Sequence, residues 1–585
     1  MKKSISLIVL ALAAISWQNV GLENWKDKVA PALLEKANRN GSVSFIVLLE
    51  EQADLSQTPR AASKEEKGQY VFQKLQETAA RSQQAAIRIL KEHQAPYQAF
   101  YIINALHSRG DLTLIQRLAA LEEVKAIQDN PEVLIEKPVK TEAAEISNRS
   151  VEWGISKIGA DQVWEMGFRG QGVVVGGQDT GFEWEHPAIQ NKYRGWDGEQ
   201  ADHNYNWHDA IHEINPLNND ANNPCGLNSP IPCDDHNHGT HTMGTMVGDD
   251  GMGNQIGVAP DARWVACRNM ERGWGSPASY IECFEWFLAP TDLNGENPDP
   301  TQAPHVINNS WSCPEIEGCN PDNFELMQLA VDHLKTAGVV VVVSAGNNGS
   351  ECSTVNTPSA IFENSFSVGA TNITDAIAGF SSRGPVLVDG SGRLKPNVSA
   401  PGVDVRSCIR GGGYASFSGT SMAGPHTVGL VALLISANPE LAGQVETIES
   451  IIEQTAASMT TDQDCADFLG AQVPNAVFGY GRIDAVAAVE AALALISDTD
   501  DAQAATVSLE MLPNPAQSYL RIAVKGLDAP RLLSFYNAAG QMVESRLIAS
   551  DGNMEWNISR WPAGIYFYQM PTAQGLLSGR LVKGE

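Results

Sequence analysis

The sequence predicts an α/β fold, a doubly wound parallel sheet, for the large central part of this 585-residue chain. Short, nearly continuous apolar runs that end in polar residues recur there, as in parallel strands buried on both faces: "GVVVGGQDTG", "ARWVACRNM", "PHVINNSWS" and "GVVVVVSAGNNG". The stretches "ELMQLAVDHLKTAG" and "ALLISA" suit the covering helices. Because ligands of such folds bind beyond the carboxyl ends of the strands, the polar residues that end these runs are candidates for a functional site.

A smaller segment, residues 29–139, precedes this central part. Its pattern predicts a strand, a long helical stretch, a strand, a short helix and a last pair of strands, at 43–51, 64–93, 99–110, 112–121 and 124–135. This order suits a small open-faced α+β unit. The charged stretch at 140–150 then separates it, as a linker does, from the central segment at 151–496.

The last part of the chain has a different pattern. A polar linker at 497–506 leads to residues 507–585, where apolar residues alternate or run between turn signals. This pattern predicts a small β-sandwich. The segment contains no cysteine and no evident catalytic cluster.

Charge and the first residues restrict the class of protein. A net charge of −29 argues against nucleic acid or an anionic membrane as partner, since the phosphate interaction would be repulsive. The opening "MKKSISLIVLALAAISW" has the charged, apolar and small-residue order of a secretory signal peptide, which we place at residues 1–16. No later apolar run reaches the length of about 18 residues that spans a bilayer. We therefore expect an exported protein without a transmembrane segment.

The nine cysteines all lie between Cys225 and Cys465. In an exported protein they indicate a disulfide framework with one cysteine left over. Close spacing favours three of the expected pairs, and the fourth follows at long range with Cys408 left free: Cys225–Cys233, Cys313–Cys319, Cys267–Cys283 and Cys352–Cys465. A zinc site is the competing interpretation, but no C-x-x-C pair occurs.

The stretch "GTSMAGPHTVGLVALLISA" places a serine, Ser421, at the start of an apolar helix. One interpretation is a helix N-cap, the common role of serine at such a position. The other is a nucleophile that attacks a carbonyl group whose oxygen becomes negative beside the helix end. The serine alone does not decide between them.

Two further positions carry polar residues that suit catalysis. Asp179 ends an apolar strand beside two glycines, and His238 and His241 open a helix of small residues. Each has a simpler interpretation, because such an aspartate is commonly a cap and such histidines are commonly structural or metal ligands. With His236 they raise a zinc hypothesis, but the H-E-x-x-H spacing is missing. In the order Asp, His and Ser, each in a glycine-rich setting, the three positions indicate a catalytic triad.

These motifs resemble those of a known family. Asp-Thr-Gly at 179–181, His-Gly-Thr-His at 238–241 and Gly-Thr-Ser-Met-Ala-Gly-Pro at 419–425 are similar to the three signature blocks of the subtilisin-like serine proteases. "HVINNSWS" and "VVSAGNNG" resemble the two strands that line the substrate cleft in that family. The run at 153–189 is most similar to the bacillopeptidase F-like branch, and the whole resemblance covers residues 150–496.

The resemblance implies a role for each matched residue. Asp179 would hold the ring of His238, and His238 would take the proton of Ser421. Asn347 would donate to the oxyanion together with the backbone N–H of Ser421. By the same match His241 is structural. An extended substrate would bind by β-pairing along a strand edge, at Ser310, Trp311, Ser312 and Gly346.

The flanking segments also resemble parts of such proteases. Residues 29–139 are similar to the inhibitory propeptide, which assists folding, blocks the cleft and is cut off, here between Lys140 and Trp153. The last segment is similar to the C-terminal sorting domain of the type IX secretion route. The resemblance thus implies a secreted or surface-attached, self-processing serine endopeptidase. Its partners would be peptide substrates, its own propeptide and the secretion machinery.

Two other functions and a metal site compete with this hypothesis. An α/β-hydrolase esterase would need G-x-S-x-G and a serine that comes first in the triad. A catalytically silent surface binding or adhesion protein on the same scaffold would have lost a triad position, and none is lost. We expect the triad to need no cofactor for catalysis. Asp234, Asp235 and the polar stretch at 215–223 could supply oxygen ligands for a structural calcium ion, or form a solvated loop.

Overall fold

The computed structural model describes residues 24–584, apart from 60–61, 136–138, 142–150, 219–222, 314–318, 322, 501–507, 528–529, 538–540, 551 and 573–574. The chain forms two compact units, Met1–Val489 and Glu490–Glu585. The signal peptide expected at residues 1–16 lies outside the described residues, as do most of the linkers expected at 140–150 and 497–506.

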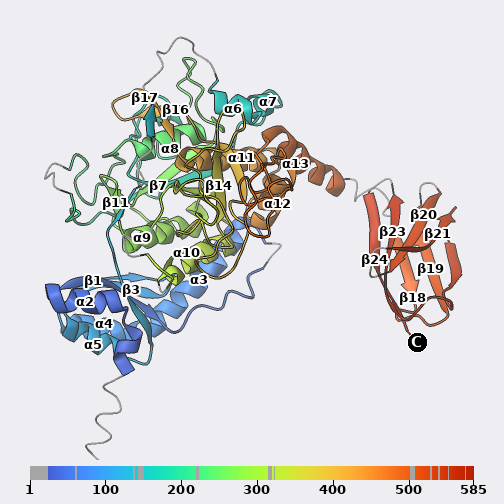
Figure 1. Ribbon diagram of the computed structural model, residues 1–585, viewed down its shortest axis with the longest axis horizontal. Helices are drawn as coiled ribbons and strands as arrows, with labels where there is room; N and C mark the ends of the chain where they lie inside the picture. Colours follow the sequence, from blue (N-terminus) through green and yellow to red (C-terminus); the bar gives the residue numbers. More distant parts are fainter. Residues whose placement is uncertain are drawn as a thin grey trace, which may run out of the picture. The chain divides into compact units, whose positions relative to one another are not determined.

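The amino-terminal segment folds into an antiparallel sheet of four strands in the order β2-β3-β1-β4 (Figure 1). The strands are β1 (Val43–Leu49), β2 (Tyr97–Phe100), β3 (Ala105–Gly110) and β4 (Val124–Asp129). Its helices are α2 (Pro31–Asn40), α3 (Lys64–Ser82), α4 (Gln84–Glu92) and α5 (Leu112–Ala119), after a 3-10 turn at Asn24–Lys28. Two short strands follow, β5 (Val133–Leu134) and β6 (Val139–Thr141).

The helical stretch predicted at 64–93 is two helices, α3 and α4, that meet at Gln83. The side chain of Gln83 is buried and donates to the carbonyl oxygen of Phe100 at 2.9 Å and to Asn104 Oδ1 at 3.1 Å. These bonds tie the junction of the helices to the turn between β2 and β3. The helical spacing of apolar residues thus continues through Gln83, although the helix itself is interrupted there by contacts with residues distant in sequence.

Strand β1 is buried on both faces, and each face serves a different core. Phe45 and Val47 pack with helices α2, α4 and α5 of their own segment. Ile46 and Leu48, which point to the opposite face, belong to a cluster that continues into helices α9 (Pro277–Leu288) and α10 (Phe324–Thr336). The amino-terminal segment and the central segment therefore share an apolar core, and both lie in the first compact unit.

The central segment contains a sheet of seven parallel strands in the order β15-β14-β13-β12-β7-β9-β8. These are β7 (Val174–Asp179), β8 (Trp207–Asp209), β9 (Arg263–Arg268), β12 (Val306–Asn309), β13 (Val340–Ser344), β14 (Phe366–Thr371) and β15 (Val398–Pro401). Residues of β12, β13 and β14 are buried without exception, as continuous apolar runs predict. The predicted parallel sheet is confirmed.

Helices cover both faces of this sheet (Figure 1). On β7, a β-carbon at Gly176 would lie 2.8 Å from Phe287 of α9, and one at Gly177 would lie 3.1 Å from Met243 of α8 (His238–Val247). Neighbouring residues of a strand point to opposite faces, so α8 and α9 lie on opposite sides. Helix α11 (Thr420–Ala437) packs on α8, and α10 packs on α9, which completes the doubly wound arrangement.

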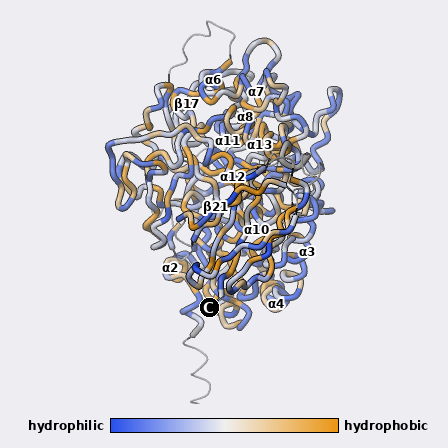
Figure 2. The backbone as a smooth tube through the Cα atoms, turned by 90° about the vertical axis from the view of Figure 1, so that its right-hand side faces the viewer, coloured by the Kyte–Doolittle hydropathy of each residue, from blue (hydrophilic) through white to orange (hydrophobic). Residues whose placement is uncertain are grey.

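The remaining elements of the central segment surround this sheet. The short strands are β10 (Met270–Glu271), β11 (Trp274–Gly275), β16 (Val405–Ile409) and β17 (Gly413–Ser418). The other helices are α6 (Trp153–Lys157), α7 (Ala160–Glu165), α12 (Val445–Thr455) and α13 (Ala485–Asp500). In Figure 2 the loops at the rim are mostly hydrophilic, in blue, and orange apolar stretches are concentrated inside.

Among the described residues, α11 is the one helix long and apolar enough to cross a membrane. However, 94% of it is buried inside the protein. A helix that is apolar all round is expected at the centre of a large core as well as in a bilayer. We assign α11 as the central core helix.

The carboxy-terminal unit consists of two antiparallel sheets, β18-β19-β22 and β21-β20-β23-β24. Its strands are β18 (Ser508–Leu512), β19 (Tyr519–Lys525), β20 (Arg531–Asn537), β21 (Met542–Ile548), β22 (Gly552–Asn557), β23 (Gly564–Thr572) and β24 (Gly575–Lys583). Residues from both sheets, including Ile522, Phe535 and Trp556, form one core. The predicted small β-sandwich is confirmed.

All four predicted disulfides are present: Cys225–Cys233, Cys267–Cys283, Cys313–Cys319 and Cys352–Cys465. Cys408 is the free cysteine, as expected, and it is buried. Burial raises the pKa of its thiol to about 12, so it stays protonated at neutral pH.

Candidate active site

The three predicted positions lie at the carboxyl edge of the sheet. Asp179 is the last residue of β7, and His238 is the first residue of α8. Helix α8 approaches the strand end closely at Gly239, where a β-carbon would lie 2.1 Å from the carbonyl oxygen of Gly181. Glycine is therefore required directly after His238, because any larger residue would push the helix away from Asp179.

Asp179 and His238 form a buried pair. His238 Nδ1 donates to both carboxylate oxygens of Asp179, at 2.8 and 2.9 Å. The backbone N–H of Thr180 also donates to this carboxylate, at 2.7 Å. With Nδ1 committed to donation, Nε2 of the neutral ring is an acceptor. It is buried and has no hydrogen-bond partner.

Ser421 is the second residue of α11. The N-cap of this helix is Gly419, without a side-chain cap, so Ser421 does not serve as the N-cap. Its hydroxyl donates to the carbonyl oxygen of Ser310 at 3.3 Å, and the hydroxyl of Ser310 donates to the carbonyl oxygen of Ser421 at 3.1 Å. The hydroxyl of Ser421 is thus turned toward the end of β12.

Asn347 follows Gly346, which has a φ of +102° and so occupies a backbone region that favours glycine. The side-chain oxygen of Asn347 accepts from the backbone N–H of Thr420 at 2.8 Å and from its hydroxyl at 2.9 Å. Both bonds fix the orientation of the amide against the first turn of α11. The NH₂ end of the amide is therefore the end that can donate to a bound group.

Asp234 joins the two chain segments that carry Asp179 and His238. Its Oδ1 accepts from Thr180 Oγ1 at 3.0 Å and from the backbone N–H groups of His236 at 2.8 Å and Asn237 at 3.0 Å. Its Oδ2 accepts from the backbone N–H of Thr240 at 3.1 Å and from its hydroxyl at 2.6 Å. One signal of this role is present in the sequence, an aspartate four residues before His238, but from the sequence alone Asp234 suggests only a calcium ligand or a solvated loop.

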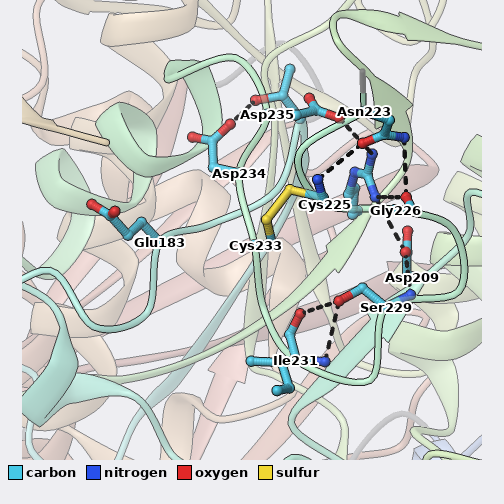
Figure 3. Close-up of a disulfide and its surroundings, with 12 residues drawn as sticks. Glu183, Asp209, Asn223, Cys225, Gly226, Ser229, Ile231, Cys233, Asp234 and Asp235 are labelled. Atoms are coloured by element: carbon cyan, nitrogen blue, oxygen red, sulfur yellow. Dashed lines mark hydrogen bonds and ion pairs between the residues drawn. A yellow bond between two sulfur atoms is a disulfide. The ribbon is translucent and has the colours of Figure 1, made fainter. Parts of the chain in front are cut away.

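Asp235, the next residue, belongs to a separate buried network. Its carboxylate pairs with Arg268, which also reaches Asp209 at 3.2 Å and the carbonyl oxygen of Gly226 at 3.1 Å. Burial raises the pKa of Asp235 to about 6, although Arg268 opposes the shift. In Figure 3 the Cys225–Cys233 disulfide lies between Asp234 on one side and Gly226 on the other. The network and the disulfide together hold the loop that precedes α8.

Asp234 and Asp235 do not fit the calcium site considered from the sequence. The oxygens of Asp234 already accept five hydrogen bonds, and Asp235 is committed to Arg268 and to the backbone N–H of Arg272. Residues 219–222 of the polar stretch lie outside the described part. Among the residues that the structure describes, no group of three or more His, Cys, Asp or Glu side chains is placed to hold a metal ion.

His241 is a core residue and does not face the carboxylate of Asp179. Its Nε2 donates to the carbonyl oxygens of Val405 at 3.1 Å and Ala415 at 3.2 Å, and its ring stacks on Phe417 with centroids 4.4 Å apart. Burial lowers the pKa of His241 to about 3, so the ring is neutral. These contacts support the structural role expected for His241.

The residues expected to bind substrate follow the carboxyl end of β12. Ser310, Trp311 and Ser312 are all buried with the amino-terminal segment in place. The ring of Trp311 stacks on Tyr280 of α9 with centroids 3.9 Å apart. Its ring thus belongs to the apolar core beside the cleft, in the same cluster as Val133 of β5.

A buried Asp–His pair and a serine at a helix start, on the carboxyl edge of a doubly wound sheet, are the arrangement of a serine hydrolase. Comparison with known proteins identifies the family. Residues 170–481, more than half of the chain, match the Subtilase family, and the chain belongs to this family of serine-type hydrolases. Residues 510–583 match the Secretion system C-terminal sorting domain, which indicates export, followed by secretion or attachment to the cell surface.

Individual relatives support this assignment. The chain is 32% identical over 503 residues to Bacillopeptidase F of Bacillus subtilis (strain 168), and the match covers 80% of this chain but 33% of the relative. It is 28% identical to the Thermostable alkaline protease of Halalkalibacterium halodurans, over 68% of this chain and 89% of the relative. It is 31% identical to Subtilisin E of Bacillus subtilis (strain 168), over 55% and 70% respectively. The chain thus spans only about a third of Bacillopeptidase F.

Proposed function

We propose that this chain is an exported serine endopeptidase that uses Asp179, His238 and Ser421 as a catalytic triad and is made as a self-processing zymogen. The observation that carries the proposal is the buried Asp179–His238 pair, whose Nε2 has no partner. His238 of this pair is the first residue of α8, and α8 packs on α11, the helix that bears Ser421.

Catalysis would begin with a rotation of the Ser421 side chain. Its hydroxyl would exchange the carbonyl oxygen of Ser310 for Nε2 of His238, the acceptor that now lacks a partner. His238 would then take the proton as Ser421 Oγ attacks the substrate carbonyl, and Asp179 would stabilise the charged ring. The carbonyl oxygen of Ser310 would then be free to accept a hydrogen bond from the backbone N–H of a bound peptide.

The negative oxygen of the tetrahedral intermediate would be held by the NH₂ group of Asn347 and by the backbone at the start of α11. His238 would pass its proton to the leaving amine, which leaves an acyl-enzyme on Ser421. Water, deprotonated by the same histidine, would release the acid. All of these steps use side chains of this chain, so we propose no cofactor for catalysis.

The proposal assigns a role to each segment. Residues 1–16 are the signal peptide, 29–139 the inhibitory propeptide, 140–150 a linker, 151–496 the catalytic domain, 497–506 a second linker and 507–585 the sorting domain. The buried contacts between the amino-terminal segment and α9 support an inhibitor held on the enzyme. The partners of the protein are then peptide substrates, its own propeptide and the secretion machinery. In this proposal Ser312 and Gly346 line the substrate cleft.

The test compares the full chain with Ser421→Ala, by casein hydrolysis and intact mass. We expect the unaltered chain to lose its amino-terminal segment and cleave casein, and Ser421→Ala to stay full-length and inactive. Ser436→Ala, near the other end of the same helix, is the matched control and should behave like the unaltered chain. Equal behaviour of the unaltered chain and Ser421→Ala would favour a silent binding protein instead.

A further inference from the structure

The segment that carries Asn347 has no helix or strand to hold it. Residues 345–365, all of which the structure describes, connect β13 to β14 without regular secondary structure. Asn347 is half-buried, and Asn348, Ser350 and Glu351 are exposed. Surface segments of this kind are usually the more mobile parts of a fold, whereas a catalytic donor has to stay within about 0.5 Å of its productive position. Other parts of the chain must therefore fix this segment.

Ser382 holds the segment on both sides of Asn347. The backbone N–H of Ser382 donates to the carbonyl oxygen of Gly346 at 2.9 Å. The hydroxyl oxygen of Ser382 accepts from the backbone N–H of Asn348 at 3.1 Å. Ser382 is itself fully buried. The residue that carries the proposed oxyanion donor thus lies between two neighbours that one buried serine holds.

Arg383, the residue after Ser382, holds the part of the segment that follows Asn347. Its backbone carbonyl oxygen accepts from the N–H of Thr354 at 2.8 Å. Its guanidinium group is buried and donates to the carbonyl oxygen of Ser350 at 2.8 Å and to the side-chain oxygen of Gln463. A buried cation is costly unless its N–H groups are hydrogen-bonded. Both acceptors are therefore needed to keep the guanidinium group in place.

Gln463 comes from a loop that is distant in sequence. This loop is closed by the backbone N–H of Thr461, which donates to the carbonyl oxygen of Gly470 at 2.9 Å. Gln463 Nε2 donates to the carbonyl oxygen of Ser350 at 2.8 Å, which is the same oxygen that Arg383 contacts. The carbonyl group of one exposed residue thus accepts from two side chains that also bond to each other.

The Cys352–Cys465 disulfide joins the same two segments by a covalent bond, across 113 residues of sequence. Ser350 and Gln463 each come two residues before one of its cysteines. Cys465 is buried, so the disulfide ties the exposed segment to the protein interior. The disulfide and the hydrogen bonds at Ser350 together form what we call the oxyanion clamp, which consists of Ser350, Cys352, Arg383, Gln463 and Cys465.

We propose that the oxyanion clamp positions the side-chain NH₂ group of Asn347 for catalysis. This inference rests on the proposed function. Arg383 and Gln463 are then positioning residues, which act through Asn347 and not on the substrate. Ser350, which the clamp holds, lies three residues after Asn347, and the bonds of Ser382 fix the backbone between Gly346 and Asn348. Loosening the clamp should let the donor move away from the oxyanion, so kcat should fall, but by less than when the donor is removed.

The first test is steady-state kinetics on a peptide substrate. Gln463→Ala removes both bonds of this side chain within the clamp, and we expect kcat to fall about 3- to 10-fold with little change in KM, because a small displacement of a catalytic group is costly. Gln463→Glu keeps the acceptor for the guanidinium group and should restore most of kcat. Cys352→Ser combined with Cys465→Ser should also lower kcat. Asp462→Asn, at an exposed position of the same loop, is the matched control and should keep the normal kcat. A normal kcat in both clamp variants overturns the inference.

A double-mutant cycle separates positioning of Asn347 from a general loss of structure. If the clamp acts through Asn347, Gln463→Ala should lower kcat by less than about twofold in a chain that already carries Asn347→Ala. A loss as large as in the otherwise unaltered chain overturns this inference and leaves the proposed function intact.

Hydrogen exchange of backbone amides gives a second measurement that needs no activity. In full-length Ser421→Ala, the added change Gln463→Ala should make the amide of Asn348 exchange faster, because the segment opens more often. Unchanged exchange at this amide contradicts the clamp. An unaltered chain that does not hydrolyse casein overturns the proposed function and this inference together.

Discussion

The two halves of the site differ in how far they are assembled. In the acid–base half, Asp179 and His238 are joined by hydrogen bonds of 2.8 and 2.9 Å, and Asp234 ties together the segments that carry them. In the nucleophile half, the amide of Asn347 is anchored, but the hydroxyl of Ser421 bonds to the carbonyl of Ser310. In the proposed mechanism the first half is ready for proton transfer, and the second half first needs a rotation of the Ser421 side chain.

The difference indicates where the proposed protease would be controlled by its amino-terminal segment. The acid–base half is held by groups of the central segment, including Asp234 and the Cys225–Cys233 disulfide. The nucleophile half borders β17, on which β6 of the amino-terminal segment is paired. Removing the amino-terminal segment should therefore alter the surroundings of Ser421 more than those of the Asp179–His238 pair.

The largest effect that tests this comparison is expected at Asn347. Asn347→Ala removes the donor proposed for the oxyanion, which typically costs about 100- to 1,000-fold in kcat with little change in KM. Thr420→Val is the matched control, because it removes one of the two bonds that anchor the amide and keeps the donor. Steady-state kinetics on a peptide substrate should show a much smaller loss for Thr420→Val. Equal losses would mean that Asn347 acts by anchoring α11.

A smaller effect is expected at Asp234, which we regard as a positioning residue. Asp234→Asn leaves one oxygen for five donors and turns an NH₂ group toward some of them. We expect the free energy of unfolding to fall by about 1–3 kcal/mol and kcat to fall roughly 10- to 100-fold, by displacement of His238 from Asp179.

Asp235→Asn separates stability from positioning. It weakens the buried pair with Arg268, which should also lower the free energy of unfolding, but its carboxylate makes no bond to the segments of Asp179 or His238. Denaturant unfolding and kcat should therefore change together for Asp234→Asn, and unfolding alone should change for Asp235→Asn. An unchanged kcat in Asp234→Asn would restrict Asp234 to a structural role.

Local patterns predicted the strands, the helix starts and three of the four disulfides, because each depends on residues that are close in sequence; the Cys352–Cys465 pair followed from the cysteines left over. The apolar run before Asp179 and the small residues after His238 carry their own signals, and both elements lie where predicted. The break at Gln83 carries none, because its partners are Phe100 and Asn104.

The same reasoning explains what the sequence could not predict about the site. The role of Asp234 depends on donors at Thr180 and Thr240, which only the fold brings together. The docking of β5 on β11 and of β6 on β17 depends on backbone pairing. Backbone pairing leaves no side-chain signature, so the sequence did not predict where these two short strands dock.

The smallest effect concerns release of the amino-terminal segment, which allows the two halves to be compared with and without it. The carboxylate of Glu285 on α9 accepts from the backbone N–H groups of Tyr101 at 2.6 Å and Ile102 at 2.9 Å. Burial, with a lesser contribution from Glu282, raises the pKa of Glu285 to about 8. A group whose pKa is raised in the complex favours the complex when protonated, so this contribution is lost as pH rises from about 4.5 to about 8.

Other interface groups act in different windows of pH. Burial lowers the pKa of Lys64 to about 8 and that of His107 to about 4. Each group therefore weakens the complex below its ordinary pKa, because it must give up a proton to be buried; this penalty is relieved as pH rises from about 4 to 6.5 for His107 and from about 8 to 10.5 for Lys64. Burial raises the pKa of Glu132 to about 7, so it adds to the effect of Glu285 only up to that pH.

Between pH 6.5 and 8 the cleaved fragment should dissociate about tenfold faster as pH rises, because Glu285 must ionise beneath it. Glu285→Gln mimics the protonated carboxyl and should remove most of this dependence and retain the fragment longer at pH 8. The measurement is the rate at which the fragment separates from the mature part, followed by size exclusion at several pH values. If Glu285→Gln keeps the full pH dependence, Glu132 becomes the group to replace. Hydrogen exchange of the backbone amides can then be compared before and after fragment release. If exchange changes in the first turn of α11 but not around Asp179 and His238, the contrast between the two halves belongs to the uncut chain and not to the processed one.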